Sequence, residues 1–213
     1  MGPAPGAGRV PPGRVPHSHN WIITFVIIGA AIFFAAAVAA AHIHRARGAH
    51  PVSALPAGFR WYSQRPGSAG AGTAGFSVAV PDSWQVSRAG VRTVIREPGG
   101  SEFLELDLTP HHDQGMVAEL YWLQRRTRLQ GTFPSYHLSY IRPVRYQGTV
   151  AADWAFSWRN QSSGRTNVLD RAWIARGPAA GQSFAIYWST PATQWRASQP
   201  VRTEFLSTFR PLP

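Results

Sequence analysis

The 213-residue chain contains no cysteine and no lysine. Without cysteine it can form neither disulfide bonds nor thiolate metal sites, so its fold must be held by packing and hydrogen bonds. The 21 basic side chains are therefore all arginine, against ten carboxylates. The G-x-S-x-G pattern of many serine hydrolases is also missing. These absences remove one common source of stability and one common class of enzyme.

The formal net charge of +11 has two explanations. A basic chain is attracted to polyanions such as lipid head groups, wall polymers or nucleic acid. Alternatively, the arginines reflect a GC-rich genome, which also favours the 20 glycines and 18 prolines. The arginines are scattered, which favours the second explanation. With no basic run and no recognised nucleic-acid module, we expect no nucleic-acid partner.

Residues 21–43 carry no charged side chain. In a helix, about 20 apolar residues at roughly 1.5 Å each span the ~30 Å hydrocarbon core of a bilayer. Trp21 lies at one edge, where interfacial aromatic residues are common. The segment predicts one transmembrane helix, preceded by a disordered Pro/Gly-rich tail over residues 1–20. Since long C-terminal domains translocate largely regardless of flanking charge, we expect that tail in the cytoplasm.

A cleaved secretory signal is the alternative interpretation of the same segment. Arg9 and Arg14 would form its basic region, residues 21–34 its apolar region and AAAVAAA its cleavage zone. Hydrophobicity continues to Ile43, which favours a retained anchor. Both interpretations place the large domain outside the cytoplasm, one in a single-pass protein of the cell membrane and the other in a secreted protein.

The rest of the chain predicts a spacer over residues 44–57 and an extracytoplasmic domain over residues 58–213. The spacer is rich in Gly, Pro, Ser and Ala, and FRWY at 59–62 suggests an edge strand. Period-2 alternation then predicts seven strands in an antiparallel meander. They are FSVAV (76–80), VRTVI (91–95), FLELDL (103–108), YHLSYI (136–141), DWAFSW (153–158), NVLDRAWIA (167–175) and SFAIYW (183–188).

Two segments interrupt this pattern with helical spacing. The first, over residues 113–130, opens with Asp113 as a possible N-cap and ends at Gly131. Its predicted apolar face consists of Met116, Val117, Leu120, Leu123 and Thr127. The second begins at Pro200, a favoured residue in the first turn. The fold class is therefore predicted to be α+β, an antiparallel sheet covered by helices. The predicted core contains Trp84, Trp154, Phe156, Phe184, Ile186, Phe205 and Phe209.

Six motifs follow one another through this domain: GFSVAVPDSW, FLELDLTP, SYHLSY, GTVAADWAFSW, SFAIYWSTP and FLSTFRP. In this order they resemble the PsbP-like extracytoplasmic domain that ends some actinobacterial membrane serine/threonine kinases and also occurs alone behind an anchor or lipobox. The resemblance covers residues 58–211 and implies an α/β/α sandwich with Trp84 packed under the sheet. The kinase motifs are absent, beginning with the strand lysine, so we expect no kinase domain and no phosphoryl transfer. Without cysteine there is no lipobox either.

Trp122, Arg125 and Arg126 form the candidate ligand-binding surface. On the first predicted helix Trp122 projects about 140° away from the apolar face. A tryptophan beside arginines can stack on or bind an anionic or carbohydrate group. The alternative is that a loop or the second helix covers Trp122.

Other polar residues predict no chemistry. His111 and His112 stand beside Asp113, and His137 could lie near in space, but adjacent side chains point apart and rarely chelate one metal ion. Glu105 and Asp107 alternate with leucines, which predicts a solvated strand face. We therefore expect no catalytic residue, no metal and no cofactor.

The sequence as a whole predicts a non-enzymatic, single-pass membrane protein that presents a binding or envelope accessory domain outside the cell. Its expected partners are the lipid bilayer and an envelope ligand or partner protein. Two alternatives stay open: a secreted form of the same domain, and an uncharacterised hydrolase-type enzyme.

Overall fold

The computed structural model describes residues 55–70, 73–109 and 115–213. The predicted tail over residues 1–20 and the predicted membrane helix over residues 21–43 lie outside these ranges. Among the described residues, no helix is both long and apolar enough to cross a membrane. The described secondary structure runs from Phe59 to Leu212.

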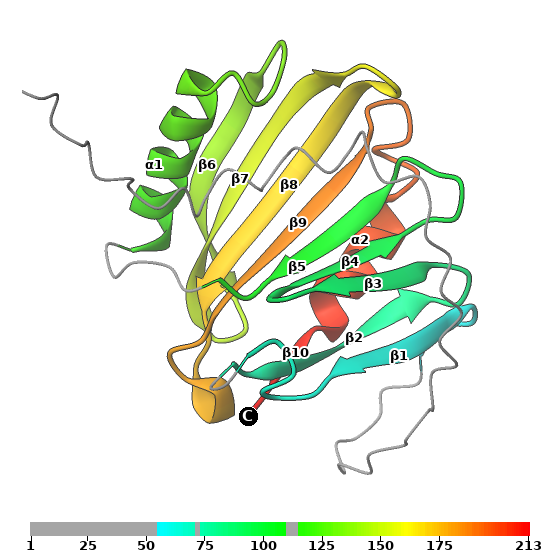
Figure 1. The fold of residues 1–213 in the computed structure, drawn as a ribbon, viewed down its shortest axis with the longest axis vertical. Coiled ribbons are helices and arrows are strands. Elements are labelled where there is room, and N and C mark those ends of the chain that lie inside the picture. The colour runs from blue at the N-terminus through cyan, green and yellow to red at the C-terminus, as the bar shows by residue number, and fades with distance from the viewer. Residues whose placement is uncertain (1–54, 71–72, 110–114) are drawn as a thin grey trace, which may run out of the picture. The chain divides into compact units, whose positions relative to one another are not determined.

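Two antiparallel sheets and two α-helices form the described domain (Figure 1). One sheet has the strand order β1-β2-β10 and the other has the order β3-β4-β5-β9-β8-β7-β6. The strands are β1 (Phe59–Gln64), β2 (Gly75–Pro81), β3 (Gln85–Ala89), β4 (Arg92–Arg96), β5 (Phe103–Asp107), β6 (His137–Tyr146), β7 (Thr149–Asn160), β8 (Gly164–Ile174), β9 (Ser183–Pro191) and β10 (Arg210–Leu212). The helices are α1 (Met116–Leu129), α2 (Gln199–Thr208) and the short 3-10 helix η3 (Gly177–Ala179). The predicted α+β class is confirmed.

The connectivity departs from the predicted single meander. All seven predicted strands are present, but β2 belongs to the smaller sheet, and β3 and β10 were not predicted. Because α1 separates β5 from β6 along the chain, β5 pairs with β9 instead, with Leu104 opposite Trp188 and Leu106 opposite Ile186. The seven-stranded sheet is thus two meanders joined at the β5–β9 pair.

The β6–β7 hairpin is closed by Gln147 and Gly148. Both residues have positive φ, 52° and 72°. This is the backbone of a two-residue type I′ turn, whose twist matches that of paired strands. The strand predicted at 136–141 continues to this turn as β6, and α1 packs on β6 and β7.

The main core lies between one face of the seven-stranded sheet, α2 and the smaller sheet. Figure 1 shows α2 behind β4 and β5. Trp84 is 7% exposed, and its ring centroid lies 5.9 Å from that of Trp188 and 5.8 Å from that of Phe205. Phe209, directly after α2, stacks on Phe76 of β2. The predicted position of Trp84 under the sheet is confirmed.

The opposite face of the sheet carries α1. Trp154 and Phe156 of β7 point to this side, with ring centroids 4.6 Å apart. Tyr136 and Phe133, which follow α1, pack on Phe156. All seven residues of the predicted core are buried. They divide between two faces because the sheet is covered on both sides, which agrees with a helix–sheet–helix sandwich to which a small second sheet is added.

The predicted solvated face of β5 is wrong. The side chain of Asp107 is 5% exposed and that of Glu105 is 17% exposed. Their common ion-pair partner, Arg92 of the neighbouring strand β4, has its Nε 3.3 Å from Asp107 and 3.6 Å from Glu105. The alternation with leucines had the right period. It signals at least partial burial on both faces, because Arg92 of β4 and Tyr187 of β9 lie on either side of these carboxylates.

Gly75, the first residue of β2, is where we expect one added methyl group to disturb the smaller sheet. A Cβ atom there would lie 2.3 Å from the backbone oxygen of Gln64 and 2.7 Å from the backbone nitrogen of Pro66. Since neither backbone atom can rotate away, Gly75→Ala is expected to lower the free energy of unfolding by about 1–3 kcal/mol. Urea denaturation followed by tryptophan fluorescence measures this. Ser77→Ala, which adds no atom to the same strand, should change it by less than about 0.5 kcal/mol. Equal midpoints for the two variants would mean that β1 and β2 are not packed this closely.

Candidate functional site

Helix α1 presents one face to the sheet and the other to solvent. Met116, Glu119, Leu120 and Gln124 are its buried residues. The N-cap is Gly115, without a side-chain hydrogen bond, while the predicted N-cap Asp113 lies outside the described residues. At the other end, Gly131 has a positive φ of 62° and its N–H donates to the carbonyl oxygen of Arg128. The predicted end of the helix is thus confirmed.

The predicted outward position of Trp122 is also confirmed. Its side chain is 48% exposed, so neither a described loop nor α2 covers it. The guanidinium carbon of Arg126 lies 5.3 Å from the centre of its ring, within the range of a cation–π contact. Arg125 is exposed on the same side of the helix. The structure therefore brings together the three residues of the predicted binding surface.

Tyr121 and Leu129 extend this surface beyond the prediction. They are 50% and 80% exposed, which makes Leu129 the most exposed large apolar residue among those described. We call the exposed side of α1, formed by Tyr121, Trp122, Arg125, Arg126, Arg128 and Leu129, the outer face of α1. In the described part of the chain, no carboxylate forms an ion pair with its three arginines. An unpaired cationic face of this kind favours an anionic partner.

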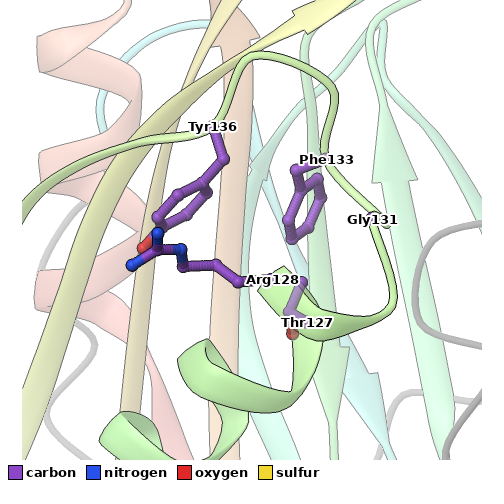
Figure 2. Close-up of a pocket in the computed structure, with 5 residues that line it drawn as sticks. All are labelled: Thr127, Arg128, Gly131, Phe133 and Tyr136. Carbon is purple, nitrogen blue, oxygen red and sulfur yellow. The ribbon is translucent and has the colours of Figure 1, made fainter.

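A small pocket of about 110 Å³ adjoins the C-terminal end of α1 (Figure 2). Figure 2 shows the rings of Phe133 and Tyr136 facing each other, with the guanidinium of Arg128 next to the Tyr136 hydroxyl. The two ring centroids lie 6.5 Å apart. Thr127 and Gly131 complete the lining. Since ligand sites usually enclose about 300–1,000 Å³, this pocket fits a ring or a small anionic group and not a whole substrate.

Buried aromatic side chains hold α1 and the pocket in place. The Trp154 Nε1–H donates to the Tyr136 hydroxyl at 3.0 Å. Phe133 packs on Phe156 and Trp158, with ring centroids 4.8 Å and 5.3 Å away. Burial raises the pKa of Tyr136, and the hydrogen bond that its oxygen accepts from Trp154 opposes this shift. The outer face of α1 therefore rests on a rigid support.

A second polar cluster lies on the same side of the sheet, where Glu105, Tyr187 and Asp170 are cross-strand neighbours on β5, β9 and β8. Burial raises the pKa of Glu105 to about 7, with Arg92 opposing the shift and Asp107 adding to it. Burial, and then the charges of Asp107 and Glu105, raise the pKa of Asp170 to about 8. Burial also raises the pKa of Tyr187.

The geometry of this carboxyl cluster favours a structural role. Asp170 is partly exposed as a residue, but its Oδ1 is buried and has no hydrogen-bond partner. A carboxyl group in this setting is more stable protonated than ionised, which is the cause of the raised pKa. None of these side chains lines the pocket beside α1. A catalytic carboxyl must reach a bound substrate, and neither the pocket beside α1 nor the small cavity lined by Trp188 and Leu206 is lined by this cluster.

The histidines give no support for a metal centre. His137 is exposed at the start of β6, and His111, His112 and Asp113 lie outside the described residues. Within residues 55–70, 73–109 and 115–213, no group of three or more His, Asp or Glu side chains is placed to hold a metal ion.

The sequence did not predict several residues of the outer face of α1, of the pocket beside it and of the carboxyl cluster. Tyr121 and Leu129 could have been found, because at about 100° per residue they project to the same side as Arg125. Phe133 and Tyr136 lie in the irregular segment after α1 and carry no periodic signal. Asp170 falls within a predicted strand, but its neighbours depend on the β8–β9 and β5–β9 pairing, which no local pattern specifies.

Comparison with solved structures defines the class of this domain as the PsbP-like α+β fold. The solution structure of the cyanobacterial PsbP protein CyanoP from Synechocystis sp. PCC 6803 is similar over 76% of this chain and 97% of that chain, with 14% identity and a TM-score of 0.53. The Ran-binding protein Mog1p of Saccharomyces cerevisiae covers 71% of this chain and 95% of its own, at 14% identity and a TM-score of 0.44. LpqN of Mycobacterium tuberculosis, described as involved in cell envelope biogenesis, is similar over 73% of this chain and 92% of its own, with 11% identity and a TM-score of 0.44.

The particular family is identified by sequence. Residues 69–211 match the family described as serine/threonine kinase C-terminal domain, and the chain belongs to this family. The resemblance inferred from its motifs is thus confirmed. No curated protein matches the chain.

Proposed function

We propose that this protein is a non-enzymatic, single-pass membrane protein that presents its PsbP-like domain outside the cell as a binding module. The outer face of α1 is its binding surface, and Trp122, Arg125 and Arg126 form the centre of that surface. The observation that carries this proposal is the exposure of Trp122 beside arginines that form no ion pair with a carboxylate of the described residues. Surface aromatic residues and arginines are the residues that most often dominate binding energy at interfaces.

Binding is favoured over catalysis by where the perturbed groups lie. The carboxyl groups of Glu105 and Asp170 have raised pKa values, as catalytic acids often do. They are nevertheless packed within the sheet, away from the pocket that aromatic side chains and Arg128 line. Aromatic walls and one cation suit recognition of a ligand more than its chemical conversion.

The placement of the protein in the membrane can be tested with cysteine labelling, because the native chain has no cysteine. A Gln161→Cys variant places one thiol in the exposed turn between β7 and β8, and a Ser18→Cys variant places one in the N-terminal tail. In intact actinobacterial cells, a membrane-impermeant maleimide is expected to label position 161 only. Position 18 should react only after the cells are permeabilised.

Two other outcomes would contradict the proposal in different ways. If the mature Ser18→Cys chain lacks residue 18 by intact mass, the segment is a cleaved signal and the protein is secreted. If position 161 reacts only after permeabilisation, the domain is not outside the cell. Carbonate extraction of the membranes provides the control, since an anchored chain stays in the pellet.

A further inference from the structure

We propose that the outer face of α1 lies on an anionic phospholipid bilayer and holds the domain against the membrane surface. This inference rests on the proposed extracytoplasmic function and specifies the partner of the same surface. It assigns the arginines to lipid phosphates and the aromatic and leucine side chains to the interface beneath them.

The composition of the outer face of α1 distinguishes a bilayer from a soluble polyanion. An anionic polymer would satisfy Arg125, Arg126 and Arg128 but would leave Leu129 in water, where it is now 80% exposed. A bilayer offers both an anionic surface and an apolar layer a few ångströms below it. Tryptophan and tyrosine are enriched where these two layers meet, because each has an apolar ring and a polar group.

Self-association through this face is opposed by its charge. Two copies of α1 meeting face to face would bring six guanidinium groups together, and Glu119, the one carboxylate of the helix, is on its buried side. Like charges in an interface disfavour docking. An anionic surface removes this repulsion instead of adding to it.

The predicted spacer over residues 44–57 is long enough to let α1 reach the membrane. The spacer over residues 44–57 can extend to roughly 50 Å, at about 3.5 Å per residue. A domain of this size has a diameter of about 40 Å, taken from the usual scaling of the radius of gyration. An anchored domain can therefore turn any of its faces, including the outer face of α1, toward the bilayer.

Labels at two positions test the contact. Ala118→Cys places an environment-sensitive fluorophore on the exposed side of α1, and Thr203→Cys places it on the exposed side of α2. The full chain is reconstituted into vesicles of phosphatidylcholine alone or with 30% phosphatidylglycerol. In the anionic vesicles we expect a blue shift at position 118 and none at position 203. The shift should be smaller in phosphatidylcholine and should weaken at high salt.

A matched pair of variants separates the role of this face from that of net charge. Arg125→Gln, Arg126→Gln and Arg128→Gln together are expected to lower the equilibrium constant for contact of α1 with anionic vesicles about 5-fold for each arginine removed. The control, Arg65→Gln, Arg145→Gln and Arg176→Gln, removes the same charge from exposed positions on other elements and should leave the shift unchanged. Leu129→Ser should weaken the shift with anionic vesicles, because it removes an apolar side chain from the proposed contact with lipid.

The outcomes that would overturn this inference are distinct from failure of the anchor. A carbonate-resistant chain without a shift at position 118 refutes the contact of α1 with lipid and leaves the anchor intact. A shift of equal size with polyphosphate assigns the face to a soluble polyanion. If the chain is not retained in vesicles, the anchor is refuted, and the shift on adding vesicles to the free chain still decides whether α1 binds lipid.

Discussion

Trp154→Ala is expected to lower the free energy of unfolding by about 3–5 kcal/mol, the range for a large aromatic side chain removed from a core. Trp154 is 4% exposed, packs on Phe156 and donates its indole N–H to Tyr136. The variant loses the buried ring, leaves a cavity under α1 and removes the donor to the phenol. Chemical denaturation measures the loss as a shift of the midpoint at unchanged slope.

Two further variants make this result specific. Trp154→Phe retains a ring and loses the hydrogen bond, so it should cost about 1–2 kcal/mol. Trp122→Ser should cost less than about 1 kcal/mol, because tryptophan and serine have similar helix propensities and only the exposed contact with Arg126 is lost. If Trp122→Ser were as destabilising as Trp154→Ala, Trp122 would belong to the core and the proposed binding surface would be wrong.

The domain should lose at least about 2 kcal/mol of stability between pH 5 and pH 7. The pKa of Asp170 is raised to about 8 in the folded protein, well above its ordinary value of 3.8. Because the folded state then binds its proton more tightly than the unfolded state, the stabilisation is complete at low pH and is lost as the pH rises. Between the two pKa values each pH unit costs about 1.4 kcal/mol for one carboxyl group. Glu105, with a pKa of about 7, acts in the same direction.

Asp170→Asn tests which group is responsible. The amide keeps the shape of the protonated carboxyl group and takes up no proton on folding, so the variant should be more stable than the native protein at pH 7 by roughly 2 kcal/mol. Its stability should also change much less between pH 5 and pH 7. The exposed Asp82→Asn is the control and should retain the native slope. Parallel pH profiles for the native protein and Asp170→Asn would show that folding does not raise the pKa of Asp170.

The elements that could be predicted from sequence are those with a strong local period. Trp84, Phe184 and Phe205 were assigned to the core from alternation or helical spacing, and all three are buried. Strands β3 and β10 were missed because they are short, and β3 is exposed along most of its length. The pairing of β5 with β9 could not be predicted. After β5 the chain leaves the sheet to form α1, and which later strand then packs beside Leu104 and Leu106 is not set by any local pattern.

The candidate site divides in the same way. Trp122 and Arg126 follow from helical geometry, which is local, and their contact is present. The burial of Glu105 and Asp107 is not local, because it depends on the position of β5 between two other strands. The pocket depends on how the segment after α1 returns to β6, and Phe133 and Tyr136 are placed there by tertiary packing alone.

The pairing of β5 with β9 and of β2 with β10 has a consequence for the order in which the domain folds. Phe103 of β5 pairs with Ser189 of β9, and Phe76 of β2 pairs with Pro211 of β10, near the end of the chain. Contacts so distant in sequence form late and slowly. A chain that crosses a membrane with its N-terminal part first cannot complete either sheet until its last residues have emerged. If the domain is exported as proposed, this topology would keep both sheets incomplete until the end of the chain has crossed, so the chain would stay unfolded during its passage.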